Sequence, residues 1–205
     1  LKNCKNKAAI KGCGDYVGGI AASGSSVTIE KCLNSGDIVN TGEPKSYNYC
    51  TGGITGGVSS NSTITLCGNT GTVSSTLKRA GGIVGSLGGT VTKCFNTGDI
   101  TGIFALGGIV GSINAKGAKV EDCYNLGDVA CITPTKEFSD TNAKGVDGVV
   151  GDATSASYTV TLTNCYNAGN VTNTATTPTD ITVGGVIGSS VVKSSSSETK
   201  NVITA

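Results

Sequence analysis

The chain contains no histidine, no methionine and no tryptophan. Without histidine it cannot build a Ser-His-Asp triad, a Cys-His nucleophile pair or an H-E-x-x-H zinc site, so most hydrolase classes are excluded. Cysteines at the C-x-x-C spacing are also missing, and with them the short-range ligand pairs of structural zinc sites. We therefore expect neither a metal nor a cofactor.

Bulky apolar side chains and net charge are both scarce. Only 37% of the 205 residues are hydrophobic and 4% are aromatic, while 32 are glycine. With 15 basic and 14 acidic side chains the formal charge is +1, and the lysines are scattered, so nucleic acid is not an expected partner. No apolar run reaches the roughly 18 residues of a membrane-spanning helix, so we expect no membrane insertion.

What the chain does contain is a repeat of two motifs. Six segments share the pattern Cys-x-Asn, and between them recurs a Gly-Gly-(Ile/Val) block, which reads Asp-Gly-Val at residues 147–149. A β-branched residue or leucine lies three positions before each cysteine of the first motif. Because turn residues separate these three apolar blocks, the pattern predicts three short strands per repeat. The six cysteines are Cys4, Cys32, Cys67, Cys94, Cys123 and Cys165.

The period of the repeat predicts the fold. Successive cysteines of the first motif are 28, 35, 27, 29 and 42 residues apart, which indicates a basic period of 27–29 residues with insertions. Twin glycines and frequent Thr, Val and Ile oppose helical repeats. We expect an all-β, right-handed parallel β-helix of about six coils over residues 1–190, and a polar tail or truncated last coil at 191–205. Because the chain opens within a repeat, we expect a fragment of a longer protein.

The alternation of Cys-(Tyr/Phe)-Asn-x-Gly-Asp-(Ile/Val) with Gly-Gly-(Ile/Val)-(Val/Ile)-Gly resembles the GLUG-repeat family of bacterial surface adhesins. Such repeats also occur outside the catalytic part of immunoglobulin A-cleaving metalloproteases. The resemblance covers residues 1–190 and is cleanest at 79–129, whereas the first two twin-glycine blocks degenerate and no protease motif is present. It implies an extracellular location on the bacterial cell surface and supplies no catalytic residue.

Two columns of the repeat are expected to be structural. The six motif cysteines predict an inward ladder of small, mostly reduced side chains, with disulfides between adjacent coils as the alternative. Cys13, Cys50 and Cys131 lie off this ladder and are expected to be exposed or reactive. Two residues after the cysteines, asparagines predict a ladder of side-chain amides at a turn, with ligand binding as the alternative: Asn34, Asn69, Asn96, Asn125 and Asn167.

Carboxylates offer the remaining route to catalysis. Asp99 and Asp128 share a repeat position, so their backbones are expected about 5 Å apart on adjacent coils, which approaches the carboxyl separation of retaining glycosidases. The same position holds Asp37, Thr72 and Asn170, however, which are all residue types common in turns. The pattern therefore favours a turn over a catalytic or calcium site.

Two features could serve binding. The residue after the ladder cysteine predicts an outward strip of Phe95, Tyr124 and Tyr166, on which a sugar or a protein could stack. Insertions at residues 39–51, 130–146 and 172–183 are expected on one edge of the solenoid, and the first two carry Tyr47, Tyr49 and Phe138. The alternatives are rings that merely cover a corner and loops that vary neutrally.

These observations favour a non-catalytic adhesin or stalk module that presents a binding face. The expected partner is a protein or glycan on the surface of a host or neighbouring cell, and the fragment itself is expected to be monomeric. The alternative is a carbohydrate-active β-helix enzyme of the polysaccharide lyase or glycosidase type, since long β-helices often carry such activities.

Overall fold

The computed structural model describes residues 1–42, 49–133, 145–153, 160–175 and 181–187, with the backbone of Val202 and Ile203. All regular structure in these residues is β-strand, arranged in five parallel sheets. We number the sheets 1 to 5 in the order in which the chain visits them.

Sheets 1 and 2 follow each ladder cysteine. Sheet 1 contains β1 (Lys5–Asn6), β6 (Leu33–Asn34), β11 (Gly68–Asn69), β16 (Phe95–Asn96), β21 (Tyr124–Asn125) and β26 (Tyr166–Asn167). Sheet 2 contains β2 (Ile10–Gly12), β7 (Ile38–Asn40), β12 (Val73–Ser75), β17 (Ile100–Gly102), β22 (Val129–Cys131) and β27 (Val171–Asn173).

Sheets 3, 4 and 5 complete the coil. Sheet 3 contains β3 (Tyr16–Gly18), β8 (Cys50–Gly52), β13 (Ala80–Gly81), β18 (Leu106–Gly107), β23 (Gly145–Asp147) and β28 (Thr182–Gly184). Sheet 4 contains β4 (Ala21–Gly24), β9 (Thr55–Val58), β14 (Val84–Leu87), β19 (Val110–Ile113) and β24 (Val150–Asp152). Sheet 5 contains β5 (Thr28–Glu30), β10 (Thr63–Thr65), β15 (Thr90–Thr92), β20 (Lys119–Glu121), β25 (Thr161–Thr163) and β29 (Val202–Ile203).

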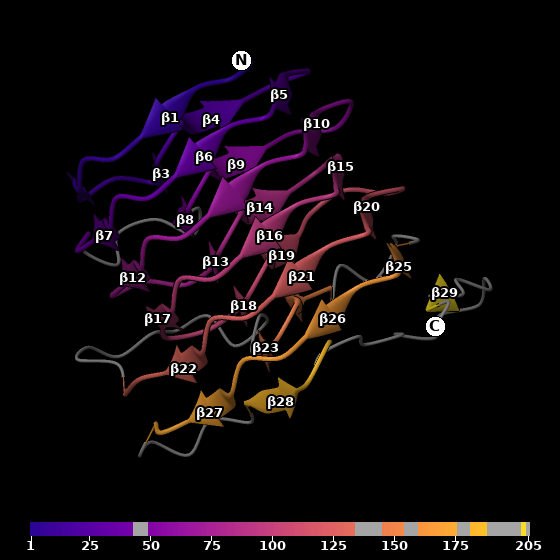
Figure 1. Ribbon diagram of the computed structural model, residues 1–205. Helices are drawn as coiled ribbons and strands as arrows, with labels where there is room; N and C mark the ends of the chain where they lie inside the picture. The colour runs from indigo at the N-terminus through magenta and orange to yellow at the C-terminus, as the bar shows by residue number, and fades with distance from the viewer. Residues whose placement is uncertain (43–48, 134–144, 154–159, 176–180, 188–201, 204–205) are drawn as a thin grey trace.

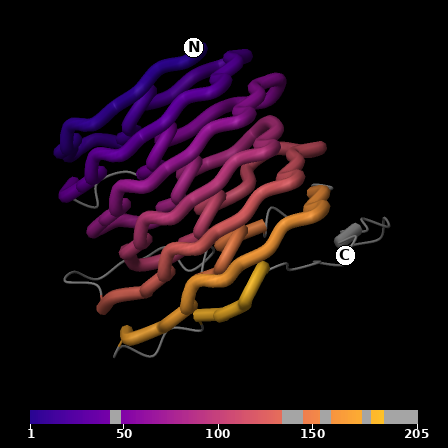
Figure 2. The backbone as a smooth tube through the Cα atoms, viewed as in Figure 1, coloured from indigo at the N-terminus to yellow at the C-terminus, as the bar shows by residue number. Residues whose placement is uncertain are grey.

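The strands form six right-handed coils stacked along one axis, from β1 at one end to β26, β27 and β28 at the other (Figure 1). Figure 2 shows the successive coils as rungs that follow the same path. Equivalent residues pair directly, as in Asn69 with Asn96 and Ile64 with Val91. The right-handed parallel β-helix expected from the sequence is confirmed, and so is the number of coils.

The expected three strands per coil were wrong, because each full coil has five. Two of the three apolar blocks are split by a bend. The turn at residues 35–37 separates β6 from β7, and the bend at Gly53 and Ile54 separates β8 from β9. Only the block before the cysteine, such as Thr63–Thr65, remains one strand.

The interior is divided into two narrow apolar clusters. One lies between sheets 4 and 5 and the ladder cysteines, and includes Ile64, Ile83 and Cys94. The other lies between sheets 2 and 3, and includes Ile100 and Leu106. These small cores are filled by aliphatic side chains and cysteine, which explains why so few aromatic residues suffice.

Candidate functional site

The asparagines of sheet 1 form a continuous column of side-chain amides between the two clusters. Each Nδ2 donates a hydrogen bond of 2.7–2.8 Å to Oδ1 of the asparagine in the next coil, from Asn6 through Asn34, Asn69, Asn96 and Asn125 to Asn167. The same nitrogen donates a second bond to a carbonyl two residues on, as from Asn96 to Gly98 at 2.7 Å. The ladder expected from the sequence is present. Its amide groups already bond to one another and to backbone carbonyls, so they are not free to bind a ligand.

The ladder explains the twin glycines. A Cβ placed on Gly82 would lie 2.3 Å from Cγ of Asn96 and 2.2 Å from the carbonyl oxygen of Gly108. The same close approach recurs where Gly53 meets Asn69. Because real Cβ atoms do not come this near, the asparagine and the second glycine of the pair are one structural unit.

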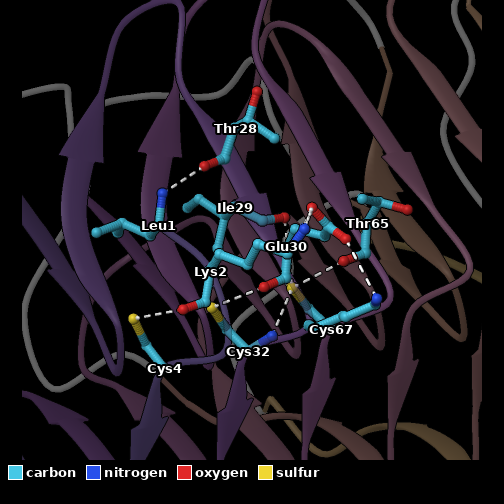
Figure 3. Close-up of polar contacts among 10 residues, drawn as sticks. Leu1, Lys2, Cys4, Thr28, Ile29, Glu30, Cys32, Thr65 and Cys67 are labelled. Atoms are coloured by element: carbon cyan, nitrogen blue, oxygen red, sulfur yellow. Dashed lines mark hydrogen bonds and ion pairs between the residues drawn. The ribbon is translucent and has the colours of Figure 1, made fainter.

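The cysteine ladder lies beside the asparagine ladder. Figure 3 shows Cys4, Cys32 and Cys67 in a row, with Sγ of Cys67 donating to the carbonyls of Thr65 at 3.2 Å and Ile29 at 3.5 Å. All nine cysteines of the chain are free thiols in the structure, and the four central members of the ladder are buried.

Neighbouring thiols in this ladder contact one another, with opposite effects on their acidity. Burial raises the pKa of Cys94, whereas hydrogen bonds from Cys165 and Cys94 lower the pKa of Cys123. The column is therefore internally satisfied and closed to solvent at its centre.

The expectation of three exposed thiols off the ladder holds only for Cys13. Cys50 and Cys131 are 1% and 0% exposed. Cys131 ends a strand of sheet 2 and points into the second cluster, where its Sγ lies 2.9 Å from the carbonyl oxygen of Ile103. Burial raises the pKa of Cys131 to about 11 and also raises that of Cys50. Both thiols therefore stay protonated at neutral pH, which makes them weak nucleophiles.

The aromatic strip forms a stack. The rings of Phe95 and Tyr124 lie 5.6 Å apart at 14°, and those of Tyr124 and Tyr166 lie 5.4 Å apart at 9°. The Phe95 ring also covers Gly68, on which a Cβ would lie 2.3 Å from Cζ. Both faces of Tyr124 are thus occupied, and the strip presents mainly ring edges apart from Tyr166, which is 52% exposed. Binding at this strip stays a prediction.

The aspartates at the turn after sheet 1 bond to the next coil. Oδ1 of Asp99 accepts the backbone N–H of Asp128 at 3.0 Å, and Oδ1 of Asp128 accepts the backbone N–H of Asn170 at 2.8 Å. Asp37 bonds to Thr72 in the same way. This repeated contact assigns the column to the turn.

The three insertions leave the coil on one edge, since each falls between a strand of sheet 2 and a strand of sheet 3. Tyr47 and Phe138 lie outside the described residues. Tyr49, which directly precedes β8, was expected to serve binding, but it is buried, with only 4% of its surface exposed.

One regular feature escaped sequence reasoning entirely. The residue before each ladder cysteine has a left-handed backbone, with φ between 52° and 57° at Asn3, Lys31, Leu66, Lys93, Asp122 and Asn164. Its N–H bonds to the next coil, as from Lys93 to Glu121 at 3.0 Å, which helps to offset about 1 kcal/mol of backbone strain. No glycine marks this corner, but Asn3, Asp122 and Asn164 are types that tolerate a left-handed backbone, so the residue types carried a partial signal.

A groove of about 320 Å³ opens on the outer face of sheet 4, and sequence reasoning missed it as well. Its floor includes Gly57 and Ser86, and its walls include Tyr16, Ser59 and Asn114. These residues come from the first four coils. The one available signal was Gly57. It pairs in register with Ser23 and Ser86, and Ser86 pairs with Ser112, so a glycine interrupts a column of serines in the first four coils.

Among the described residues, no three Cys, Asp or Glu side chains are placed to hold a metal ion. The same part of the chain contains no helix of the length and apolar character needed to cross a membrane.

Comparison with known families identifies one repeat. Residues 77–101 match the family model described as the GLUG motif. This segment begins in the connection between β12 and β13 and ends within β17. The chain carries a GLUG motif. The matched segment contains Gly81-Gly82, Cys94 and Asn96, so the GLUG motif includes both halves of the asparagine and glycine contact. The resemblance drawn from the sequence is confirmed. No curated protein and no solved structure matches the chain.

Proposed function

We propose that this GLUG-repeat solenoid is a non-catalytic module of an extracellular bacterial surface protein. It presents a binding face to a protein or glycan on a host or neighbouring cell. The observation that carries the proposal is the internal use of the repeated polar residues. Asn96 bonds to Asn69 and Asn125, and Asp99 bonds to Asp128. The polar side chains that recur in the repeat therefore form hydrogen bonds between adjacent coils.

The same observation argues against a carbohydrate-active enzyme. A retaining glycosidase needs two carboxyl groups that face the substrate, whereas Asp99 and Asp128 each hold a backbone N–H of the following coil. A cysteine nucleophile needs both a lowered pKa and access to the substrate. Burial raises the pKa of Cys50, and Cys123, whose pKa is lowered, is buried in the ladder. The surface location rests on the GLUG resemblance, and the binding face on the insertions that share one edge.

The proposal is tested by measuring binding and turnover on the same preparation. The chain is applied to a glycan array and to cultured host and bacterial cells, and is incubated with a panel of polysaccharides. We expect saturable binding to cells or glycans and no new reducing ends or unsaturated products. Polysaccharide turnover without stable binding would overturn the proposal in favour of an enzyme. If neither binding nor turnover is detected, the module would be a spacer without a binding face, which would also overturn the proposal.

A matched variant separates the loops from the scaffold. Residues 132–144, between Cys131 and Gly145, are replaced by residues 103–104, which lie between the register-equivalent positions 102 and 105 in the preceding coil. The coils keep their stacking contacts, so a loss of cell binding in this variant would assign the binding face to the insertion edge. Unchanged cell binding would move that face elsewhere on the solenoid.

A further inference from the structure

The groove on sheet 4 is built by an irregularity in an otherwise regular column. Ser23, Gly57, Ser86 and Ser112 pair in register along β4, β9, β14 and β19. At Gly57 the side chain is missing, and the ring of Tyr16 lies over the vacant position. A Cβ on Gly57 would lie 2.7 Å from Cε1 of that ring. The hollow therefore depends on one glycine and one tyrosine from different coils.

The walls of the groove carry neutral polar groups. Oγ of Ser59 donates to Oγ of Ser25 at 2.9 Å, and Nδ2 of Asn114 donates to Oγ of Ser86 at 2.8 Å. Ser25, Ser59 and Asn114 are exposed, while Ser86 is 3% exposed and forms part of the floor. Hydroxyl and amide groups both donate and accept, so these side chains keep hydrogen-bonding capacity for a ligand.

The groove offers no charge to an ionic ligand. None of the nine described residues that line it is Asp, Glu, Lys or Arg. Tyr16 is 39% exposed, so its ring edge and hydroxyl remain available beside the hydroxyl groups. An aromatic surface next to neutral donors and acceptors matches a sugar ring, which has apolar C–H faces and hydroxyl edges.

We propose that this groove binds a neutral saccharide, with Tyr16 contacting the sugar ring and Ser25, Ser59 and Asn114 bonding to its hydroxyls. A volume near 320 Å³ is at the lower end of the range for small-molecule sites and accommodates one or two sugar rings. The inference rests on the proposed role as a binding module, and it adds to the insertion edge a second binding place, on sheet 4, with its ligand class.

The aromatic stack on sheet 1 provides the matched comparison. Tyr124 has both ring faces covered by Phe95 and Tyr166, so a sugar has little ring surface to contact there. Tyr16, by contrast, stands over a glycine at the margin of a hollow. Substituting Tyr16 and Tyr124 therefore removes the same kind of side chain from the groove and from the aromatic stack.

The experiment begins with an array of neutral and charged glycans and continues by calorimetric titration with the neutral oligosaccharide retained best. We expect Tyr16→Ala to weaken binding at least tenfold, and Tyr124→Ala to change it less than twofold. Asn114→Ala is expected to weaken binding severalfold. Because no charge takes part, the affinity of the intact chain should be the same at low and high salt.

Circular dichroism of each variant verifies that the solenoid is folded, which is expected because Tyr16 and Asn114 are exposed. The inference is overturned if only charged glycans are retained, if no neutral glycan is retained, or if the folded Tyr16→Ala variant binds as well as the intact chain. The two proposals can fail separately. Full glycan binding by the folded Tyr16→Ala variant defeats the saccharide groove and leaves the surface module standing, whereas an intact chain that binds neither cells nor glycans defeats both.

Discussion

The asparagine ladder of sheet 1 and the column of Ser23, Gly57, Ser86 and Ser112 in sheet 4 each take one residue per coil. They differ in whether the surface beside them is open to a ligand. In the ladder every coil contributes the same amide, and each amide satisfies the next. In the serine column Gly57 interrupts the series, and a groove opens at the interruption. The comparison teaches that perfect repetition consumes polar groups, while a break in repetition exposes them.

The largest expected effect comes from breaking the ladder at its centre. Asn96→Ala leaves Nδ2 of Asn69, Oδ1 of Asn125 and the carbonyl of Gly98 without their partner in a buried column. At about 1–3 kcal/mol for each unsatisfied buried group, we expect a loss of about 4 kcal/mol in stability, measured by urea unfolding.

The matched control for this ladder substitution is Asn6→Ala, in the first coil. Asn6 is only partly buried and donates to Asn34 from one end of the column. We expect this change to cost less than about 1.5 kcal/mol. Equal losses at the two positions would show that the ladder does not act as a buried network.

The next largest effect comes from the glycine column that faces the ladder. Gly82→Ala places a methyl group 2.2 Å from the carbonyl oxygen of Gly108, so we expect a loss of about 3 kcal/mol by overpacking. Gly185→Ala tests the same repeat position at the last coil, where a Cβ meets nothing within 4 Å. Its urea midpoint should stay unchanged or rise slightly, and a large loss there would contradict the steric explanation.

A smaller effect concerns alkaline pH and sharpens the contrast between buried and exposed thiols. The folded pKa of Cys131 is raised from 9.0 to about 11, so its contribution to stability is complete below pH 9 and is lost as the pH rises toward 11. Thermal unfolding from pH 8 to 11 should therefore show a shallower decline in Cys131→Ala than in the unmodified chain. Cys13→Ala, at an exposed position, should keep the original decline.

The smallest effect belongs to the surface of the first coil. A hydrogen bond from Lys2, whose Nζ lies 3.1 Å from Oε2 of Glu30, lowers the pKa of that carboxyl. The pair therefore adds stability above the ordinary pKa of glutamate, and this is lost as the pH falls through the lowered value. Lys2→Ala should lower the melting temperature slightly at pH 7 and not at pH 3, with Lys5→Ala as the control. A difference that persists at pH 3 would assign the effect to packing.

Much of the architecture was predictable because it repeats. The spacing from Cys67 to Cys94 is one full coil, and a residue type that returns once per coil must stack on itself in any parallel solenoid. The asparagine ladder followed from the same reasoning. The bends at Gly53-Ile54 and before each ladder cysteine did not, because they depend on how two columns approach each other across the coil.

The candidate site was the least predictable part for the same reason. Tyr49, Cys50 and Cys131 are spaced irregularly in the sequence, and only the folded structure shows that all three are buried. Tyr16 and Asn114 are nearly a hundred residues apart and share a groove solely because the first four coils stack in register. By itself the sequence determined the period, the parallel stacking and the two ladders, since these are properties of equivalent positions. The tertiary structure alone decided the corners, the buried thiols and the groove, because each arises where residues from different columns meet in space.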